Sequence, residues 1–381
     1  MRDAAANRAG RWGWILLLIL AALGALVPFN PDVVERWYST TVYPRIERVL
    51  TPISNVLPVA WLDILSVLAV IWLVSTWWRA IKADVLPRWP RIRRAAAMTI
   101  AFAASLYLAF LLLWGLNYRR VPMTERLALR NESASTESAV QLARETVARL
   151  NGTYALAHNA GWTDAWRNPN LRDAFASVQQ QLVDAPLVVP GRLKRSMYGP
   201  FFRWTAVDGM VNPFGLEVLR NPDLLAFERP FVAAHEWAHL AGFADESEAN
   251  FVGWLTCIHA DPSSQYSGWL YLYWQVSGEL AAHERETVAR ELREGPRSDL
   301  SAIVARLRKG DLPLLRQASW KMYDSYLKAN RVDAGVRSYG AVVTLILRAK
   351  FDDGWRPVRR ARALPRSSAP PSSAEDTAPA R

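Results

Sequence analysis

Three long apolar runs constrain the fold of this chain more than any other feature of its sequence. They cover residues 12–29, 59–78 and 95–116, and together they contain a single charged residue, Asp63. About 20 apolar residues in a helix span the hydrocarbon core of a bilayer, where a backbone has no water to satisfy its polar groups. We therefore expect residues 1–118 to form an α-helical membrane region with three transmembrane helices.

Basic residues flank these runs unevenly. The connector of residues 79–94 holds six Lys and Arg against one Asp, whereas residues 31–58 are balanced in charge. Because Lys and Arg stay on the cytoplasmic side, we expect a multi-pass protein of the cytoplasmic membrane whose chain after Asn117 lies outside, although the Arg119–Arg120 pair argues the other way. The charge of +11 is thus attributed to topology, and no nucleic-acid partner is expected. The single Cys257 excludes an internal disulfide.

A pair of histidines occurs in the later, more polar part of the chain, as His235-Glu236-Trp-Ala-His239. Two histidines four residues apart on a helix share a face and can bind one metal ion from the same side. Pro230 can open this helix and Gly242 can end it. Glu236 lies at a neighbouring angle, where it can take a proton from metal-bound water. We predict a zinc site with both histidines as ligands and Glu236 as the catalytic base.

The residues that follow offer a third ligand, since a catalytic zinc ion usually has three protein ligands and one open position. Asp245 is expected to cap a second helix, with Glu248 completing a capping box. Glu246 and Asn250 then share a face of that helix, and Gly253 in line with them would let the two helices approach closely. We predict Glu246 as the third ligand and Asn250 as a residue that orients a ligand histidine; Glu248 stays open as an alternative ligand.

The segment before the histidine helix predicts a small sheet. Gly and Pro separate three short apolar stretches, residues 186–190, 203–207 and 209–212, which are typical of strands. A free strand edge beside the zinc helix could hold an extended peptide, or the sheet could merely cover the helix. Helical periodicity is frequent elsewhere in residues 119–350, the expected catalytic domain, whereas the basic, Pro- and Ser-rich residues 351–381 predict a disordered tail.

Four later side chains are candidates for donating a hydrogen bond to the oxyanion of a tetrahedral intermediate: Tyr266, Tyr271, Tyr273 and His283. Each such residue is more often a packed aromatic ring or a surface histidine, because Tyr and His are commonly half-buried. The sequence leaves this role open among the four.

With these residues in view, the chain resembles a bacterial membrane-protein family catalogued as domain of unknown function 3810, whose motif is of the gluzincin metallopeptidase type. The resemblance covers most of residues 30–330. It rests on Tyr43-Pro44, residues 58–63, Gly115-Leu-Asn-Tyr-Arg119, Pro230-Phe231 before the histidine pair, Glu246-x-Glu248-Ala-Asn250-Phe251, and Tyr266-Ser-Gly268. It implies an α+β zincin-like domain with a small sheet beside the active helix, zinc bound by His235, His239 and Glu246, and Glu236 as base and then acid. Asn250 stands where several gluzincins have Asp.

The expected function is a membrane-anchored zinc metallopeptidase, whose partners are a peptide or protein substrate and the lipid bilayer. Zinc would polarise the scissile carbonyl and acidify water, and Glu236 would carry the proton. One rival is an inactive zinc-containing binding or assembly protein, but structural zinc sites usually have four ligands and are rich in Cys. Another is an intramembrane protease, which the acidic residues around the motif disfavour.

Overall fold

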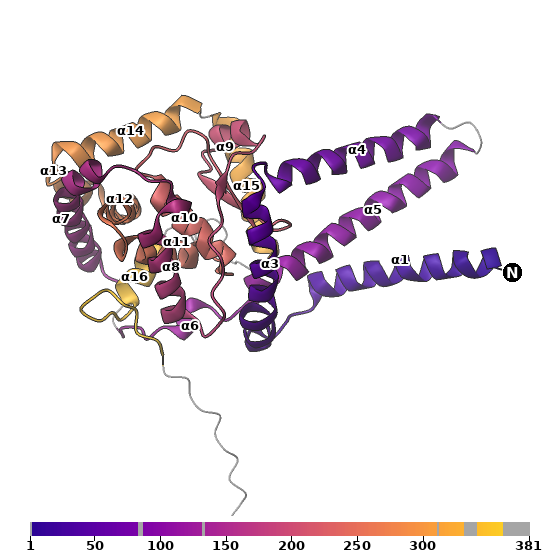
Figure 1. Cartoon of the computed structure of the whole chain (residues 1–381), viewed down its shortest axis with the longest axis horizontal. Helices are drawn as coiled ribbons and strands as arrows, with labels where there is room; N and C mark the ends of the chain where they lie inside the picture. Colours follow the sequence, from indigo (N-terminus) through magenta and orange to yellow (C-terminus); the bar gives the residue numbers. More distant parts are fainter. Residues whose placement is uncertain (1, 83–86, 132–133, 311, 331–340, 361–381) are drawn as a thin grey trace, which may run out of the picture.

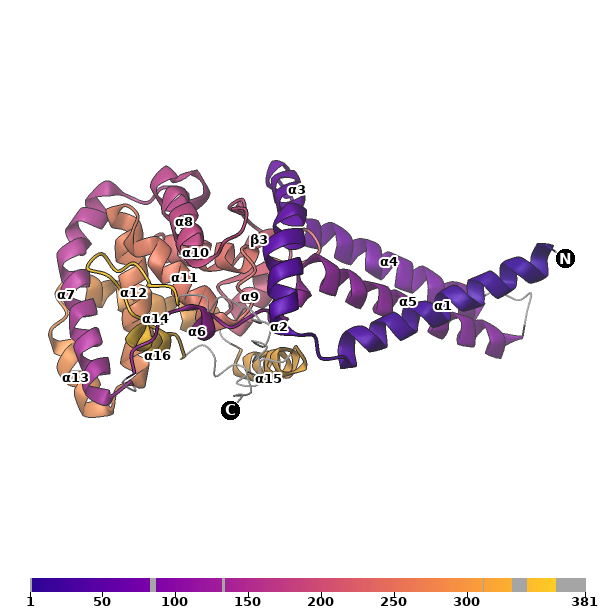
Figure 2. The ribbon, with the colours of Figure 1, turned by 90° about the horizontal axis from the view of Figure 1, so that it is seen from below.

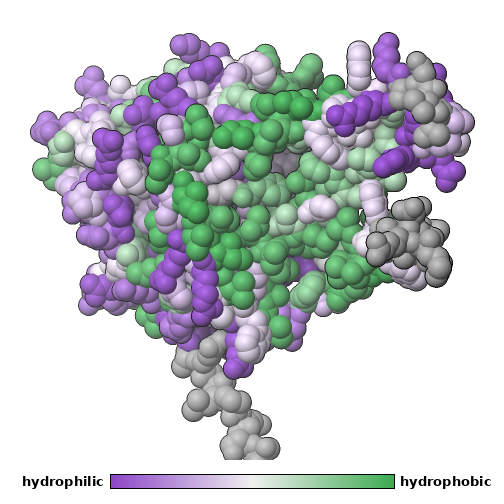
Figure 3. All heavy atoms as spheres, turned by 45° about the vertical axis from the view of Figure 1, so that its right-hand side comes forward, coloured by the Kyte–Doolittle hydropathy of each residue, from purple (hydrophilic) through white to green (hydrophobic). Residues whose placement is uncertain are grey.

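Three long helices project together from one side of a mainly helical domain (Figure 1). The computed structural model describes residues 2–82, 87–131, 134–310, 312–330 and 341–360, with side chains from residue 12 onward. The projecting helices are α1 (Arg2–Leu26), α4 (Trp61–Lys82) and α5 (Arg88–Leu113). Apolar side chains gather on the face from which they project (Figure 3).

Two of these helices, α4 and α5, are each long and apolar enough to cross a membrane. The described part of α1 meets the same criterion only together with residues Pro31–Val56, from which it is bent by 112°. The structure therefore holds two or three helices with the dimensions of a membrane span, where the sequence predicted three.

The chain between α1 and α4 lies across the junction of the projecting helices and the domain (Figure 2). It contains α2 (Pro31–Val33), the π-helical η1 (Val34–Val42) and α3 (Tyr43–Val56). Thr51 of α3 donates a hydrogen bond to the carbonyl oxygen of Leu216, at 2.9 Å. Buried Glu217 accepts hydrogen bonds from the backbone N–H groups of Trp61 and Leu62, at 2.9 and 2.8 Å, and so caps the start of α4.

The helices of the domain surround a central pair, α10 and α11, which pack along each other. Trp237 of α10 and Trp254 of α11 are fully buried, as expected for helices enclosed by the core. The helices are η2 (Gly115–Arg119), α6 (Met123–Arg126), α7 (Thr136–Ala160), η3 (Ala165–Arg167), α8 (Pro169–Leu182), α9 (Gly199–Thr205), α10 (Arg229–Leu240), α11 (Glu246–Ile258), α12 (Pro262–Glu279), α13 (Ala282–Arg290), α14 (Glu294–Gly310), α15 (Pro313–Ala329) and α16 (Ala341–Arg348).

A three-stranded sheet lies beside α10. Its strands β1 (Leu193–Lys194), β2 (Gly209–Asn212) and β3 (Glu217–Arg220) are arranged in the order β1-β3-β2. β2 pairs with β3 in antiparallel register, with Met210 opposite Leu219, and β1 pairs with β3 in parallel. Among the described residues β2 is therefore an edge strand, and it contacts α10.

The predicted strand at residues 209–212 is confirmed, and the other two are wrong. Residues 203–205 belong to α9, where Pro200 occupies the first turn at no hydrogen-bonding cost and the buried Phe202 and Thr205 share one face. Residues 186–190 join no ladder, because the N–H of Val189 donates instead to the carboxylate of Glu47.

Part of the segment predicted as a tail belongs to the folded domain. Residues 349–360 form isolated bridges with the chain before α7, including Leu129 with Ala349 and Leu127 with Arg359. Leu127 and Ala349 are buried. Local composition misses this, because the bridges join residues more than 200 positions apart. The rest of the predicted tail, residues 361–381, lies outside the described residues.

Candidate metal centre

Two histidines and a glutamate converge where α10 meets the start of α11. Nε2 of His235 lies 3.4 Å and Nε2 of His239 3.5 Å from Oε2 of Glu246. One ligand atom from each of the three residues lies within 4.8 Å of the others, so the three could hold one metal ion. The structure thus brings together the three residues that the sequence predicts as ligands.

Local sequence explains why these side chains meet. Pro230 stands in the first turn of α10, and Gly242, with φ of 80°, takes the left-handed conformation that ends the helix. Asp245 caps α11 by accepting hydrogen bonds from the N–H groups of Ser247 and Glu248. A Cβ on Gly253 would lie 3.0 Å from the backbone nitrogen of His235, which is tighter than most Cβ contacts, so glycine favours this close approach of the two helices.

Hydrogen bonds orient two of the three groups. Nδ1 of His239 lies 2.8 Å from the carbonyl oxygen of Phe243, which directs Nε2 toward Glu246. Tyr323, on the distant helix α15, donates a hydrogen bond to Oε1 of Glu246. The other carboxylate oxygen, Oε2, is buried, has no hydrogen-bond partner within the described ranges, and is the atom that faces both histidines.

The electrostatics of the cluster favour a positive charge at its centre. Burial alone would lower the pKa of His239, but the carboxylate of Glu246 outweighs this and raises the pKa to about 9. Burial alone would raise the pKa of Glu246, yet the two histidines hold it well below its ordinary value. A bound cation would supply the positive charge that a proton supplies here, so these residues fit a metal that prefers nitrogen and oxygen ligands.

Two neighbouring side chains differ from their predicted roles. The carboxylate of Glu248 does not complete a capping box: it accepts a hydrogen bond from the N–H of Met123 and lies 3.6 Å from Arg126. Nδ2 of buried Asn250 has no hydrogen-bond partner, and His239 is oriented by the carbonyl of Phe243 instead. Glu248 thus pairs with a residue distant in sequence and not with the start of its own helix. For His239, a backbone carbonyl takes the orienting role that was predicted for the side chain of Asn250.

Glu236 lies beside the cluster and is 3% exposed. In the part of the chain that the structure describes, its Oε2 atom has no hydrogen-bond partner. Burial raises the pKa of Glu236 to about 7, against the lowering effect of His235 and His239. A carboxyl group with a pKa near neutrality can both accept and donate a proton, which is what general acid–base chemistry requires.

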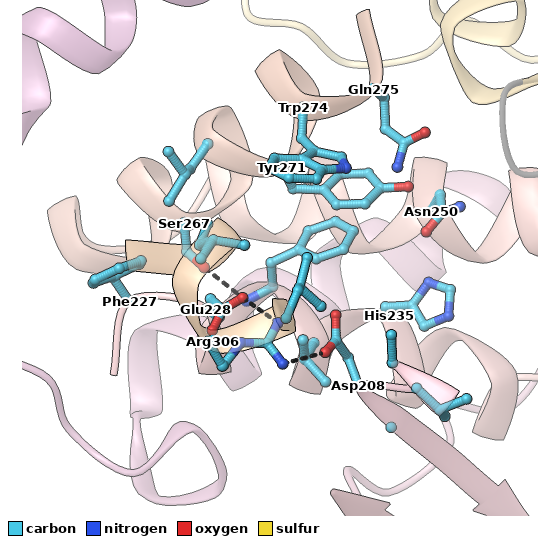
Figure 4. A pocket seen from close by; sticks show the side chains of 18 of the residues that line it. Asp208, Phe227, Glu228, His235, Asn250, Ser267, Tyr271, Trp274, Gln275 and Arg306 are labelled. Carbon is cyan, nitrogen blue, oxygen red and sulfur yellow. Dashed lines mark hydrogen bonds and ion pairs between the residues drawn. The ribbon is translucent and has the colours of Figure 1, made fainter. Parts of the chain in front are cut away.

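A cavity of about 260 Å³ opens beside Glu236 and His235 (Figure 4). Its walls are mostly apolar, with the rings of Phe231 and Tyr271 stacked at a centroid distance of 3.6 Å. At one side Arg306 forms ion pairs with Asp208, at 3.0 Å, and with Glu228, at 2.6 Å. The lining includes residues Ala206, Val207, Asp208 and Gly209, which lead into and begin the edge strand β2.

Of the four side chains considered as oxyanion donors, Tyr271 lies at this cavity. Its hydroxyl is buried and has no hydrogen-bond partner among the residues that the structure describes. The hydroxyl of Tyr266 instead donates to Asp299, at 2.6 Å, away from the cluster. Tyr273 lines a different hollow, and His283 stands on α13. The structure therefore separates Tyr271 from the other three by position.

Residues close to the membrane region hold the carbonyl end of α10. The indole N–H of Trp114 donates to the carbonyl oxygen of His239, at 2.9 Å. The hydroxyl of Tyr43 donates to the carbonyl oxygen of Leu240, at 2.7 Å. Arg120 donates to the carbonyl oxygen of Gly242, at 2.9 Å. Tyr43 satisfies a carbonyl that the end of the helix leaves unpaired, and the three contacts together fix the helix that bears the histidines to the base of α5.

Sequence reasoning missed several residues of the centre. Tyr323, Asp208 and Arg306 come from segments that are distant in sequence, and none belongs to a recognisable motif. Gly209 offered a signal, since a glycine inside a strand often marks a close approach of another group. A Cβ at this position would lie 2.4 Å from Oε1 of Glu236.

Taken together, the fold and site define a mainly helical protein with apolar projecting helices and a His-His-Glu cluster that could hold a metal ion. A family model described as "Protein of unknown function (DUF3810)" matches residues 38–347. The chain belongs to this family, which confirms the family resemblance seen in the sequence. Neither the curated proteins nor the solved structures contain a match.

Proposed function

We propose that this protein is a membrane-anchored zinc metallopeptidase with a zincin-like domain of the gluzincin type. The observation that carries the proposal is the convergence of His235, His239 and Glu246 next to a buried glutamate, Glu236, at the mouth of an apolar cavity. Two histidines and one glutamate are a known ligand set of catalytic zinc in peptidases.

Zinc held by these three residues would polarise the scissile carbonyl and make water more acidic. The donor set supports zinc, because Oε2 of Glu246 faces both histidines and Tyr323 holds the other oxygen. Within the described part of the chain the cluster has three members, which leaves a coordination position for water or substrate.

Glu236 is proposed to move the proton. It takes a proton from the attacking water and later gives it to the leaving amine. Its burial and a pKa raised to about 7 support both halves of this role at neutral pH. Tyr271 is proposed to donate a hydrogen bond to the oxyanion, since its buried hydroxyl lacks a partner and its ring lines the cavity.

The substrate is proposed to lie as an extended peptide along the free edge of β2. The edge strand begins at Gly209, against Glu236, so a peptide paired with it would pass the base. The cavity lined by Phe231, Tyr271 and Leu270 would receive an apolar side chain of that peptide.

The domain is proposed to lie outside the cytoplasmic membrane. The facing ends of the apolar helices α4 and α5, together with the segment between them (residues 79–94), hold six Lys and Arg against one Asp, and such regions stay in the cytoplasm. In this arrangement α4 takes the chain to the cytoplasmic side and α5 returns it to the outer side at η2, where the domain continues.

The test is Glu236→Gln in the full-length protein purified in detergent. We expect zinc at about one equivalent in both proteins and hydrolysis of a peptide library by the wild type alone. Glu279→Gln, an exposed residue at the end of α12, serves as the matched control and should keep full activity. Unchanged hydrolysis by Glu236→Gln would refute the proposed base. A zinc-loaded wild type that cleaves nothing would favour a zinc-containing binding or assembly protein instead.

A further inference from the structure

Helix α15 carries a stripe of apolar side chains that the described part of the domain does not cover. At about 100° per residue, Leu314, Leu315, Met322 and Tyr326 fall within roughly 120° of the helix surface. Leu314 is 84% and Met322 69% exposed. Side chains on another face of the same helix point inward, with Leu327 fully buried. The helix therefore has one face for the domain and a second apolar face directed away from it.

Helix α9 extends this apolar stripe. The N–H of Leu312, which precedes α15, lies 3.3 Å from the carbonyl oxygen of Trp204 in α9, and the two helices pack together. Phe201 and Trp204 are 36% and 42% exposed. We name the combined surface the juxtamembrane face; it consists of Phe201, Trp204, Leu312, Leu314, Leu315 and Met322.

This face lies where the long apolar helices leave the domain (Figures 1 and 2). Tyr198, just before α9, donates a hydrogen bond to Ser66 in the second turn of α4, at 2.8 Å. On α15, the ring of Tyr326 lies 6.2 Å from that of Phe110 in the last turn of α5. The apolar surface of the projecting helices, green in Figure 3, thus continues onto this part of the domain.

We infer that the juxtamembrane face docks on the lipid bilayer and that the candidate metal centre therefore acts on polypeptide segments at the membrane surface. The occupant is a bilayer because the face adjoins the helices that are long enough to span one. Exposed aromatic side chains bordered by Lys and Arg are typical of helices that lie in a membrane interface. The exposed basic residues of α9 and α15 are Arg203, Arg316, Lys321 and Lys328.

The same helix joins this face to the site. Tyr323 of α15 donates a hydrogen bond to Glu246, and Trp320 lines the cavity next to Glu236. A helix with its side chains is only about 10 Å across, so the cluster lies about one helix diameter from the docked surface. The substrate class follows from this distance and rests on the proposed function: the membrane-adjacent segment of an anchored protein reaches such a site readily, and a freely diffusing peptide has no advantage there.

Docking is tested without reference to activity, on the full chain in nanodiscs of phosphatidylcholine and phosphatidylglycerol. Nitroxide labels are placed at Leu314→Cys and Met322→Cys, with Ala282→Cys on α13 as the control at the end of the domain opposite the projecting helices. The native Cys257 is buried, and the unsubstituted protein gives the labelling blank. We expect the two labels on α15 to be accessible to oxygen and shielded from a water-soluble nickel reagent, and the control to show the reverse. Labels on α15 as open to nickel as the control, or shielded from both reagents as in a protein interface, would overturn docking.

The substrate class is tested with one peptide in two forms, free and tethered to the nanodisc by an acyl chain. We expect the wild type to cleave the tethered form faster than the free form. In Leu314→Glu/Met322→Glu the ratio of these two rates should fall by at least about tenfold, which is the factor that corresponds to removing one leucine side chain from a bilayer. Cleavage of the free form should stay unchanged, because neither residue lines the cavity. Equal cleavage of both forms by the wild type would overturn the substrate class alone. Cleavage of neither form would refute the proposed function, while the nitroxide result would still decide docking.

Discussion

Gly209 is the residue on which the position of Glu236 depends most directly. A Cβ there would lie 2.4 Å from Oε1 and 2.9 Å from Cδ of Glu236. In Gly209→Ala the carboxylate must move, and a displacement of about 1 Å at a catalytic group can cost roughly 10²-fold in rate. We expect that loss in kcat/KM with little change in zinc content, because the atoms displaced are the far end of a flexible side chain.

The matched control for this prediction is Gly278→Ala near the end of α12. A Cβ at Gly278 would meet no atom within 4 Å, so this variant should keep its activity. If Gly209→Ala hydrolyses peptides as fast as the wild type, the close approach of β2 to Glu236 has no catalytic consequence. If it loses zinc as well, the effect belongs to the fold and not to the base.

Glu47 gives a prediction about pH. Burial raises the pKa of Glu47 to about 7, although the N–H of Val189 donates to its carboxylate. A carboxyl group with a raised pKa in the folded state favours folding at low pH, and this contribution is lost as pH rises from about 4.5 to about 7. Glu47→Gln keeps an acceptor for Val189 but cannot ionise. We expect its free energy of unfolding to fall less than that of the wild type between pH 5 and 7, by about 2 kcal/mol. Parallel stability curves for the two proteins would contradict the raised pKa.

At the scale of elements, the carbonyl end of α10 depends on distant helices. The hydroxyl of buried Tyr43 donates to the carbonyl oxygen of Leu240. Tyr43→Phe leaves that carbonyl buried and unpaired, which costs roughly 1–3 kcal/mol. We expect a loss of this size in the free energy of unfolding in detergent, and a change of a few tenths at most for the control Tyr154→Phe on α7. Equal stability of the two variants would mean that water replaces the lost hydroxyl.

The same elements show what sequence could and could not predict. The spacing of His235 and His239, the glycine stop and the Asp245 cap all act within one or two turns, so the pattern predicts both helices and the meeting of the histidines with Glu246. Tyr323 and Trp114 reach the site across 77 and 125 residues of sequence, and no local rule selects them. The capping-box prediction for Glu248 is wrong for the same reason: the N–H of Met123, distant in sequence, donates a hydrogen bond to its carboxylate.

The junction between the helices and the domain shows why the strand predictions failed in part. The stretch at residues 203–207 has the composition of a strand, but its first three residues end helix α9, in which the buried Phe202 and Thr205 share a face and Phe202 packs against Ala60 and Leu219. Residues 186–190 also have the composition of a strand, yet their backbone groups form hydrogen bonds with Glu47 and Arg48 of α3. In both stretches, contacts with distant parts of the chain determine the backbone conformation. Residues 209–212 form a strand because their partner strand, β3, lies nearby in sequence.

At the scale of the whole molecule, hydrogen bonds between buried groups join the membrane region to the domain across the predicted boundary at residue 118. Tyr43 and Trp114 hold the end of α10 from the amino-terminal side of that boundary. Glu217, in the domain, caps the start of α4 in return. The predicted division into residues 1–118 and 119–350 therefore separates groups that satisfy each other's hydrogen bonds.

A fragment of residues 119–360 tests whether the two parts are independent. It lacks Tyr43 and Trp114 and keeps only Arg120 of the three donors at the end of α10, so we expect it to lose cooperative thermal unfolding and to bind no stoichiometric zinc. A chain that begins at residue 30 keeps Tyr43, Trp114 and α4, and it should retain both properties in detergent, since the contacts that it loses are those of α1 with α5 and Arg119. A cooperative, zinc-loaded 119–360 fragment would show that the domain folds alone. In that case the membrane helices would serve only as an anchor, and their contacts with α10 would not be required for the site.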